Sequence, residues 1–358
     1  MNRDIFEDLF VLEMANNHNG KLEKGLRIIT EFSQIVRFNN IRAGIKLQFR
    51  DLNTLFHKDF RESDVRYVRR TLDRQLSNEE LAVLVNAIRK SNCIPICTPF
   101  DEASVDLCTE LGIQIIKIAS AYLNDWFLIE KIASTKKPVI VSTGGYSQKD
   151  LDDLVIFFEH RNIPLAINHC VAIYPTEDSQ LELNQIDLLK NRYPNHTIGL
   201  SSHEYHDWSA SILIAYAKGA RTFERHIDIE MDGILVPPYC SLPAQTVQWI
   251  QAFKKAKEMC GISGAEKRAF PDAELKYLDT QVRGVYAKRN LTEGHILSTE
   301  DVYLAIPLQK GQICCREFMS GEVLLKGCEK DQAITINMID SPYANDENLR
   351  KSIYERGL

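Results

Sequence analysis

The sequence lacks the features that would place the protein in a membrane or on a nucleic acid. No apolar run reaches the roughly 20 residues that a membrane-spanning helix needs, and acidic residues interrupt the N-terminal apolar run, unlike in a signal peptide. The formal net charge is −6 over 358 residues, whereas a nucleic-acid surface needs a concentrated basic patch. We therefore expect a cytoplasmic protein that binds neither membranes nor nucleic acids.

The cysteines do not have the spacing of a disulfide framework or of a zinc site. The chain has nine cysteines, an odd number, and neither Cys93 and Cys97 nor the adjacent Cys314 and Cys315 form part of a zinc-finger pattern. Disulfides and a zinc site are therefore not expected, and free thiols are typical of the reducing cytosol.

Basic residues cluster once, at Arg66, Arg69, Arg70 and Arg74. They stand at helical spacing among acidic residues, which favours a solvated helix face over a binding surface.

Short apolar segments alternate with longer amphipathic stretches, several of which begin at a helix-capping signal such as Ser77 with Glu80, or Ser147 with Asp150. The eight strand candidates are Leu9–Met14, Gly44–Phe49, Pro95–Pro99, Ile115–Ala119, Val139–Thr143, Leu165–His169, Thr197–Ser201 and Arg221–His226. Continuous apolar strands alternating with helices indicate a parallel sheet covered by helices. Eight such units predict a (β/α)8 TIM barrel, of the α/β class, over residues 1–260. An open doubly wound sheet is the alternative, but no G-x-G-x-x-G loop follows the first strand.

The character of the chain changes after residue 260. Residues 261–281 are polar and irregular, which predicts a linker. Closely spaced glycine turns then predict a small C-terminal β-rich domain over residues 282–340. Residues 341–358 are expected to form a polar, peripheral tail.

Every predicted barrel strand ends in a group capable of chemistry, and barrel active sites lie at these ends. The groups are Glu13, Lys46, Thr98, Lys117 with Ser120, Ser142, His169, Ser201 with His203, and Glu224 with His226. A lone lysine could reach the surface along its aliphatic stem. Two lysines flanked by apolar residues would be costly to bury without an anion, so with the hydroxyls they predict a pocket for a phosphate and a carboxylate.

His203 and His226 end neighbouring strands of the predicted barrel. Two neutral imidazoles so placed, with Glu224 nearby, can bind a divalent metal such as Mn²⁺, Mg²⁺ or Co²⁺. The alternative is a pair of hydrogen-bonded core histidines. We expect Cys170 to serve packing, since a buried free cysteine behaves as a small hydrophobe, and the sequence leaves the role of His169 open.

These residues carry a resemblance to the N-acetylneuraminate (sialic acid) synthase family. The matching segments are 12–20 (LEMANNHNG), 46–48 (KLQ), 98–100 (TPF), 117–120 (KIAS), 142–144 (STG), 169–176 (HCVAIYPT), 198–203 (IGLSSH) and 224–226 (ERH). They span the predicted barrel in the family's order. The C-terminal module, with 290–294 (NLTEG), resembles the family's antifreeze-like (SAF) domain.

The resemblance implies condensation of phosphoenolpyruvate with an open-chain aldose, an amino or deoxy sugar, to give a 3-deoxy-2-ulosonic acid and phosphate. A divalent metal held by the matches of His203 and His226 would polarise the aldehyde. The phosphoenolpyruvate-binding residues would be Lys46, Thr98, Lys117, Ser120, Ser142 and Ser201. Glu13 is the candidate for activating water or handling the proton, with Glu224 as its support or rival. The family's domain-swapped homodimer is implied as well.

The departures from the family pattern fall mainly on the acceptor side. Ala172 stands where the family has an asparagine, Pro237 where it has an aspartate that binds sugar hydroxyls, and Ile306 where it has an arginine. Tyr174 matches a substrate-binding position, and Arg316 is close enough in sequence to replace the lost arginine. Because a site that hydrogen-bonds a hydroxyl selects for it, we expect a changed acceptor, such as a sugar related to legionaminic or pseudaminic precursors.

Two other functions stay open from the sequence. One is a related aldolase or 3-deoxy-octulosonate phosphate type synthase. The absence of a second phosphate-binding cluster would argue against a phosphorylated acceptor, but the sequence alone does not place such a cluster. The other is a non-catalytic, ligand-binding barrel, which the lost acceptor residues favour and the retained lysines, histidines and Glu13 disfavour.

Overall fold

The structure, a computed structural model, describes residues 4–231, 233–261 and 264–358. The chain divides into two compact units, Met1–Gly261 and Ile262–Leu358. Within the described residues, no helix combines the length and the apolar character that crossing a membrane would require. The nine cysteines are free thiols, as predicted.

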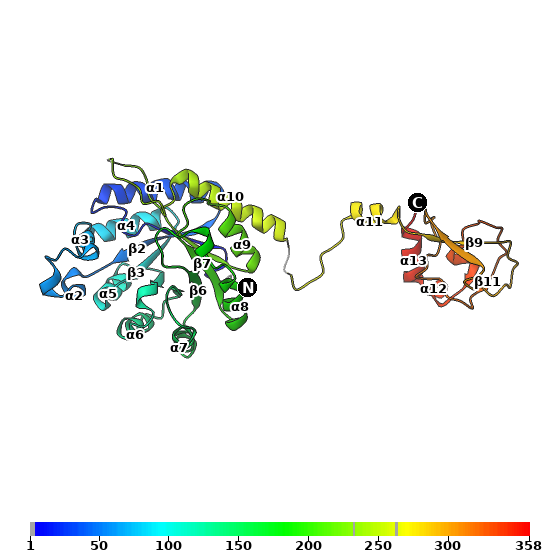
Figure 1. The fold of residues 1–358 in the computed structure, drawn as a ribbon, viewed down its shortest axis with the longest axis horizontal. Helices are drawn as coiled ribbons and strands as arrows, with labels where there is room; N and C mark the ends of the chain where they lie inside the picture. Colours follow the sequence, from blue (N-terminus) through cyan, green and yellow to red (C-terminus); the bar gives the residue numbers. More distant parts are fainter. Residues whose placement is uncertain (1–3, 232, 262–263) are drawn as a thin grey trace. The chain divides into compact units, whose positions relative to one another are not determined.

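The first unit is a closed barrel of eight parallel strands in the order β1 to β8, surrounded by helices (Figure 1). The strands are β1 (Leu9–Glu13), β2 (Arg42–Phe49), β3 (Ile94–Pro99), β4 (Ile115–Ile118), β5 (Val139–Ser142), β6 (Leu165–Cys170), β7 (Thr197–Ser202) and β8 (Thr222–His226). All eight predicted strands are present, with ends shifted by one or two residues. The (β/α)8 prediction is confirmed, and the open sheet is excluded because β1 pairs with both β2 and β8.

Helices connect the strands. They are α1 (Leu22–Asn39), α2 (Leu52–Leu55), α3 (Arg66–Leu72), α4 (Asn78–Lys90), α5 (Glu102–Glu110), α6 (Trp126–Ser134), α7 (Gln148–Glu159), α8 (Gln185–Arg192), α9 (Ala210–Lys218) and α10 (Pro243–Cys260), with short 3₁₀ turns η1 (Lys58–Phe60), η2 (Ser120–Tyr122) and η3 (Asp178–Gln180). Helices α4 and α7 begin at the predicted capping boxes. In α4, Ser77 Oγ accepts from the Glu80 N–H while the Glu80 carboxylate accepts from the Ser77 N–H, so two otherwise unpaired donors are satisfied.

The second unit is built from small antiparallel pairings around its own apolar core. Its strands are β9 (Gly284–Ala287), β10 (Val302–Ala305), β11 (Val323–Leu324) and β12 (Ile339–Asp340), and its helices are α11 (Asp272–Asp279), η4 (Ile336–Met338), α12 (Pro342–Asn345) and α13 (Glu347–Glu355). Helix α11 lies in the stretch predicted as a linker and buries none of its residues.

The expectation of a peripheral tail after residue 341 is wrong. Helices α12 and α13 occupy that stretch, and Ile353 of α13 is buried in the core of the second unit. Tyr343 and Tyr354 pack against the same core. The stretch is polar in composition, but one apolar side chain of α13, Ile353, is buried and anchors it to the core.

Candidate active site

The site is one layer of the barrel interior. Side chains alternate between the two faces of a strand, so residues two apart share a face. A buried apolar cluster includes Val11, Ile96, Ile115 and Ile140 from β1, β3, β4 and β5. Two residues further along the same strands stand Glu13, Thr98, Lys117 and Ser142. The alternation that fills the barrel with apolar side chains therefore also points these polar groups inward at the C-terminal ends of the strands.

A cavity of about 660 Å³ opens at these ends. Eleven of the predicted site residues line it, namely Glu13, Lys46, Thr98, Lys117, Ser120, Ser142, Tyr174, Ser201, His203, Glu224 and His226. The barrel thus brings together every site residue that the sequence placed on it. Arg316 belongs to the second unit and is exposed there. Its contact with a substrate stays a prediction.

Lys46 lies at the bottom of the cavity and is only 4% exposed. Its ammonium group forms an ion pair with Glu13, its register partner across β1 and β2. It also lies 3.4 Å from Glu224 Oε1 and donates to Thr98 Oγ1 at 3.1 Å. Burial alone would lower the pKa of Lys46, but the two carboxylates outweigh burial and raise it. Lys46 is therefore held as a cation.

Lys117, 2% exposed, has different partners. Its ammonium donates to Ser142 Oγ at 2.6 Å and to the Ile118 carbonyl at 3.0 Å. Among the described residues no carboxylate lies within ion-pair distance of it, and burial lowers its pKa. Such a cation gains most from an anion that enters the cavity from outside.

The two carboxylates of the cavity differ electrostatically. Burial raises the pKa of Glu13, and Lys46 offsets that effect only in part. Burial also opposes ionisation of Glu224, but Lys46 and Lys117 together hold the pKa of Glu224 below its ordinary value. Glu224 is therefore the more firmly anionic of the two, and Glu13 is the one that more readily holds a proton.

Two serines complete the base of the cavity. Ser120 Oγ accepts from the Gly144 N–H at 3.1 Å, and Ser201 Oγ donates to Glu224 Oε1 at 3.3 Å. A Cβ at Gly144 would lie 2.9 Å from Ser120 Oγ and 3.1 Å from the Ala172 Cβ. Glycine is needed here because the backbone approaches Ser120 so closely.

His203 and His226 face each other with ring centroids 5.5 Å apart. His203 Nδ1 bonds to the Val171 carbonyl at 3.0 Å, and His226 Nδ1 is buried without a hydrogen-bond partner. Burial lowers the pKa of His203 to about 4 and the pKa of His226 well below its usual value, so both imidazoles are neutral. Neutral imidazoles, one of them with an unpaired ring nitrogen, fit a metal bound by two histidines together with substrate and water. Among the described residues, no third His, Cys, Asp or Glu joins them as a ligand group.

Aromatic rings border the histidines. Tyr174 lies with its ring centroid 4.0 Å from that of His203, and Tyr239 lies 5.2 Å from His226 and 5.3 Å from Tyr174. Tyr239, which sequence reasoning missed, follows the Pro237–Pro238 segment. His169, by contrast, donates from Nε2 to the Leu181 carbonyl at 2.7 Å and does not line this cavity.

Sequence reasoning also missed an arginine group. Arg66, Arg70 and Arg74 line the cavity together with Arg50 of the β2–α2 loop. Arg66 and Arg70 are exposed, as the predicted solvated helix face requires, but together with the half-buried Arg74 they also line the cavity. Arg69 pairs with Asp64 at 2.7 Å and lies outside the cavity. The usable signal was the spacing of 66, 70 and 74, because residues four apart share one side of a helix.

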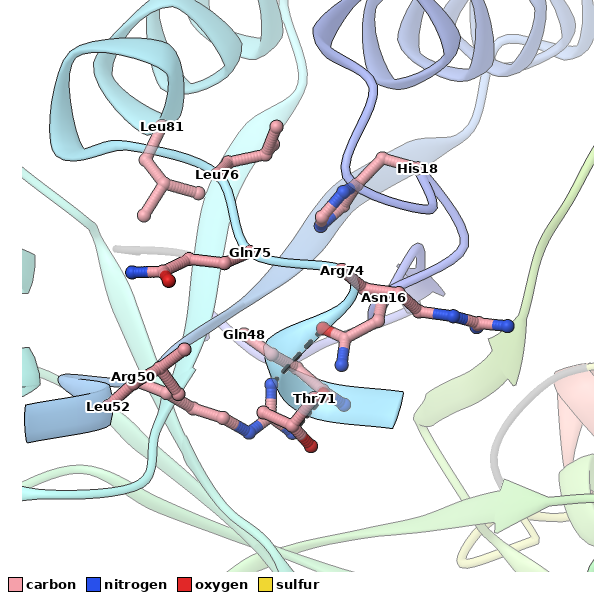
Figure 2. Close-up of a pocket in the computed structure, with 10 residues that line it drawn as sticks. All are labelled: Asn16, His18, Gln48, Arg50, Leu52, Thr71, Arg74, Gln75, Leu76 and Leu81. Atoms are coloured by element: carbon pink, nitrogen blue, oxygen red, sulfur yellow. Dashed lines mark hydrogen bonds between the residues drawn. The ribbon is translucent and has the colours of Figure 1, made fainter. Parts of the chain in front are cut away.

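Arg50 is held by its neighbours. It donates to Asn16 Oδ1 at 3.1 Å and to Gln48 Oε1 at 2.6 Å, and its guanidinium stacks 3.8 Å from the centre of the Phe100 ring. Figure 2 shows the bond to Asn16 in an adjoining pocket that Arg74 also lines. The guanidinium is thus oriented before any ligand binds.

Comparison with known proteins identifies the family. The model of the NeuB family matches residues 40–262, more than half of the chain. The chain belongs to the NeuB family. The predicted membership among sialic acid synthase-like enzymes is therefore confirmed.

Relatives of this NeuB-family chain cover most of its length. The spore coat polysaccharide biosynthesis protein E structure from Chromobacterium violaceum superposes with a TM-score of 0.90 at 37% identity, covering 93% of this chain and 100% of that one. The N,N'-diacetyllegionaminic acid synthase of Campylobacter jejuni is 24% identical over 91% of this chain and 98% of its own length. The N-acetylneuraminate-9-phosphate synthase of Drosophila melanogaster is 24% identical over 92% and 95%.

Proposed function

We propose that the protein condenses phosphoenolpyruvate with an open-chain aldose to give a 3-deoxy-2-ulosonic acid of the nonulosonic class and inorganic phosphate. The observation that carries this proposal is the pair of buried lysines, Lys46 and Lys117, at the base of one cavity among four hydroxyl groups. Phosphoenolpyruvate carries a phosphate and a carboxylate, which two buried cations and several donors would neutralise and orient. The names of the Campylobacter and Drosophila relatives support the same reaction type.

In the proposed reaction, a bond forms between C3 of phosphoenolpyruvate and the aldehyde carbon. Water adds at C2, and the bond from C2 to the phosphate oxygen breaks as phosphate leaves. Lys117, which has no carboxylate partner among the described residues, would bind one anionic group of the substrate, and Lys46 with Thr98 the other. Glu13, with its raised pKa, would take and return the proton, while Glu224 stays anionic beside Ser201.

A divalent metal, Mn²⁺, Mg²⁺ or Co²⁺, would be held by His203 and His226. When bound it would supply a Lewis acid for the aldehyde oxygen. The hydrogen bond that His203 Nδ1 donates to the Val171 carbonyl fixes which ring nitrogen faces the cavity, and the unpaired Nδ1 of His226 supports the assignment. Tyr174 beside His203 would contact the sugar.

We further propose that the second unit is an antifreeze-like domain that presents Arg316 to the sugar in a partner subunit's barrel, in a domain-swapped homodimer. Light scattering of the full chain tests this arrangement. A dimer whose activity falls in Arg316→Gln supports it, and an active monomer contradicts it.

The function is tested by phosphate release from phosphoenolpyruvate with each metal across a panel of amino, deoxy and neutral aldoses, with mass detection of the product. We expect release that depends on the aldose and the metal, and its loss in His226→Ala together with loss of Mn²⁺ binding. The matched control is His206→Ala, an exposed histidine outside the cavity that should behave as the wild type. Failure of the folded protein to bind phosphoenolpyruvate would refute the proposal.

A further inference from the structure

The cavity carries more positive charge than phosphoenolpyruvate and its own carboxylates account for. Its lining includes six cationic side chains, Lys46, Arg50, Arg66, Arg70, Arg74 and Lys117. Among the described residues two carboxylates, Glu13 and Glu224, line it, and the histidines are neutral. The lining therefore has an excess of four positive charges, although the whole chain has a net charge of −6.

We propose that the acceptor is a phosphorylated aldose, whose phosphate binds the arginine group formed by Arg66, Arg70 and Arg74 of α3 and its C-terminal turn with Arg50 opposite. The proposal rests on the proposed function, because it names the second substrate of that reaction. The sequence alone did not place a second phosphate-binding cluster, and the arginine group is a candidate for it.

Three of the four arginines in the group come from α3 and the turn at its C-terminal end. Positions 66, 70 and 74 are four residues apart, which stacks their side chains on one side. Arg69, on the same helix, points elsewhere, pairs with the exposed Asp64 and does not line the cavity. Helix α3 and the turn after it therefore carry both a surface arginine with a carboxylate partner and three arginines that share a cavity.

The three cavity arginines have few partners of their own. Among the described residues, no carboxylate lies within ion-pair distance of Arg66, Arg70 or Arg74. Arg70 hydrogen-bonds the Tyr239 hydroxyl, which is a neutral group. Burial and the nearby Arg70 both lower the pKa of Arg74, so these cations repel one another until an anion binds. Like charges gathered in one cavity without counter-charges are the usual environment of a bound phosphate.

Two parts of the cavity would bind two different anions. The base, with Lys46 and Lys117, is buried to within a few per cent and already matches phosphoenolpyruvate in donors. Arg66 and Arg70 are exposed, and Arg74 and Arg50 are half-buried, so these four form the rim. A cavity of about 660 Å³ has room for a sugar that spans from the histidines to the rim. Four guanidinium groups offer more paired donors than one carboxylate accepts, which favours the three terminal oxygens of a phosphate.

The test measures binding and turnover for matched pairs of aldoses with and without a terminal phosphate, such as N-acetylmannosamine and its 6-phosphate, and mannose and mannose 6-phosphate. Calorimetric titrations use the full chain with phosphoenolpyruvate at saturation, so that the base of the cavity is occupied, and with EDTA. The variants are Arg70→Gln/Arg74→Gln and the control Arg69→Gln. Binding of phosphoenolpyruvate alone is measured first, because its absence would refute the proposed function independently of the acceptor.

We expect the phosphorylated member of a pair to bind at least about tenfold more tightly than the neutral member, since each charged hydrogen bond is worth about that factor. The double variant should lose this preference, with the KM for phosphoenolpyruvate unchanged, and Arg69→Gln should keep it. Equal binding of both members in every pair would overturn the proposal while leaving the proposed function standing. A double variant that keeps the preference, or that loses affinity for phosphoenolpyruvate instead, would overturn it too.

Discussion

The two buried lysines are expected to respond oppositely to the same substitution. Lys46→Met removes the cation that pairs with Glu13 and lies beside Glu224, which leaves buried carboxylates without it. Breaking a buried ion pair from one side costs about 3–5 kcal/mol of unfolding free energy. Lys117→Met removes a cation whose pKa burial has lowered and which has no ion-pair partner among the described residues. We therefore expect Lys117→Met to be no less stable than the wild type.

Both substitutions should nevertheless weaken phosphoenolpyruvate binding. Each removes one charged hydrogen-bond donor from a buried anion site, which is worth about 1.5–3 kcal/mol, or roughly 10- to 150-fold in affinity. Urea denaturation without ligand measures stability, and calorimetry with phosphoenolpyruvate measures affinity. Lys149→Met, at an exposed surface pair with Asp153, is the control and should leave both stability and affinity at the wild-type level.

The pH dependence separates the lysines further. The folded pKa of Lys117 is depressed below 10.5, so the unfolded chain binds more protons in the window between the folded value and 10.5, and stability should rise with pH there. Lys117→Met should lack this rise. The folded pKa of Lys46 is raised, so its contribution is present below 10.5 and is lost as the pH passes above the folded value. The reasoning is wrong if Lys117→Met destabilises the ligand-free protein as much as Lys46→Met.

Three further predictions concern single positions. Ala172→Asn should lower the KM for phosphoenolpyruvate about fivefold in steady-state kinetics by adding one hydrogen bond at the cavity, and an unchanged or raised KM would contradict this. Gly199→Ala should lower the free energy of unfolding by about 1–3 kcal/mol in thermal or urea denaturation, because the added Cβ would lie 1.8 Å from Thr222 Oγ1. Wild-type stability would show instead that the barrel accommodates the methyl group. Burial and nearby cations lower the pKa of His18 to about 4, so His18 alone should contribute about 3 kcal/mol to the fall in stability between pH 6.5 and 4, as the unfolded chain takes up the proton. His18→Asn should flatten this part of the pH profile.

The barrel and the base of its cavity were predictable because they follow a strong local pattern. The apolar strand segments identify β1 to β8, and strand alternation then points Glu13, Lys117 and Ser142 into the mouth. The ion pairs and hydrogen bonds that set the pKa values of these groups were not predictable. The difference between Glu13 and Glu224 depends on which lysine lies beside which carboxylate, and that depends on register and on side-chain conformation.

The rim of the cavity and the tail were missed for a related reason. Arg69 and Arg70 are adjacent in sequence and identical in chemistry, and only the orientation of α3 against the barrel separates a surface group from a cavity group. Ile353 stands in a polar stretch, and only the packing of α13 shows that it belongs to a core. Tertiary contacts decide such positions, and composition averages over them.

The contrast between an acidic chain and a basic cavity also affects how fast substrates arrive. The cavity has a positive potential although the chain as a whole is acidic, and this potential attracts anions to the barrel mouth and raises their association rates. Salt screens the attraction beyond a Debye length of about 8 Å at physiological ionic strength. Measured by stopped flow, the association rate of phosphoenolpyruvate should therefore fall as ionic strength rises. The same potential would retain the phosphate ion that the proposed reaction releases, so inorganic phosphate should act as a product inhibitor, and most strongly at low salt.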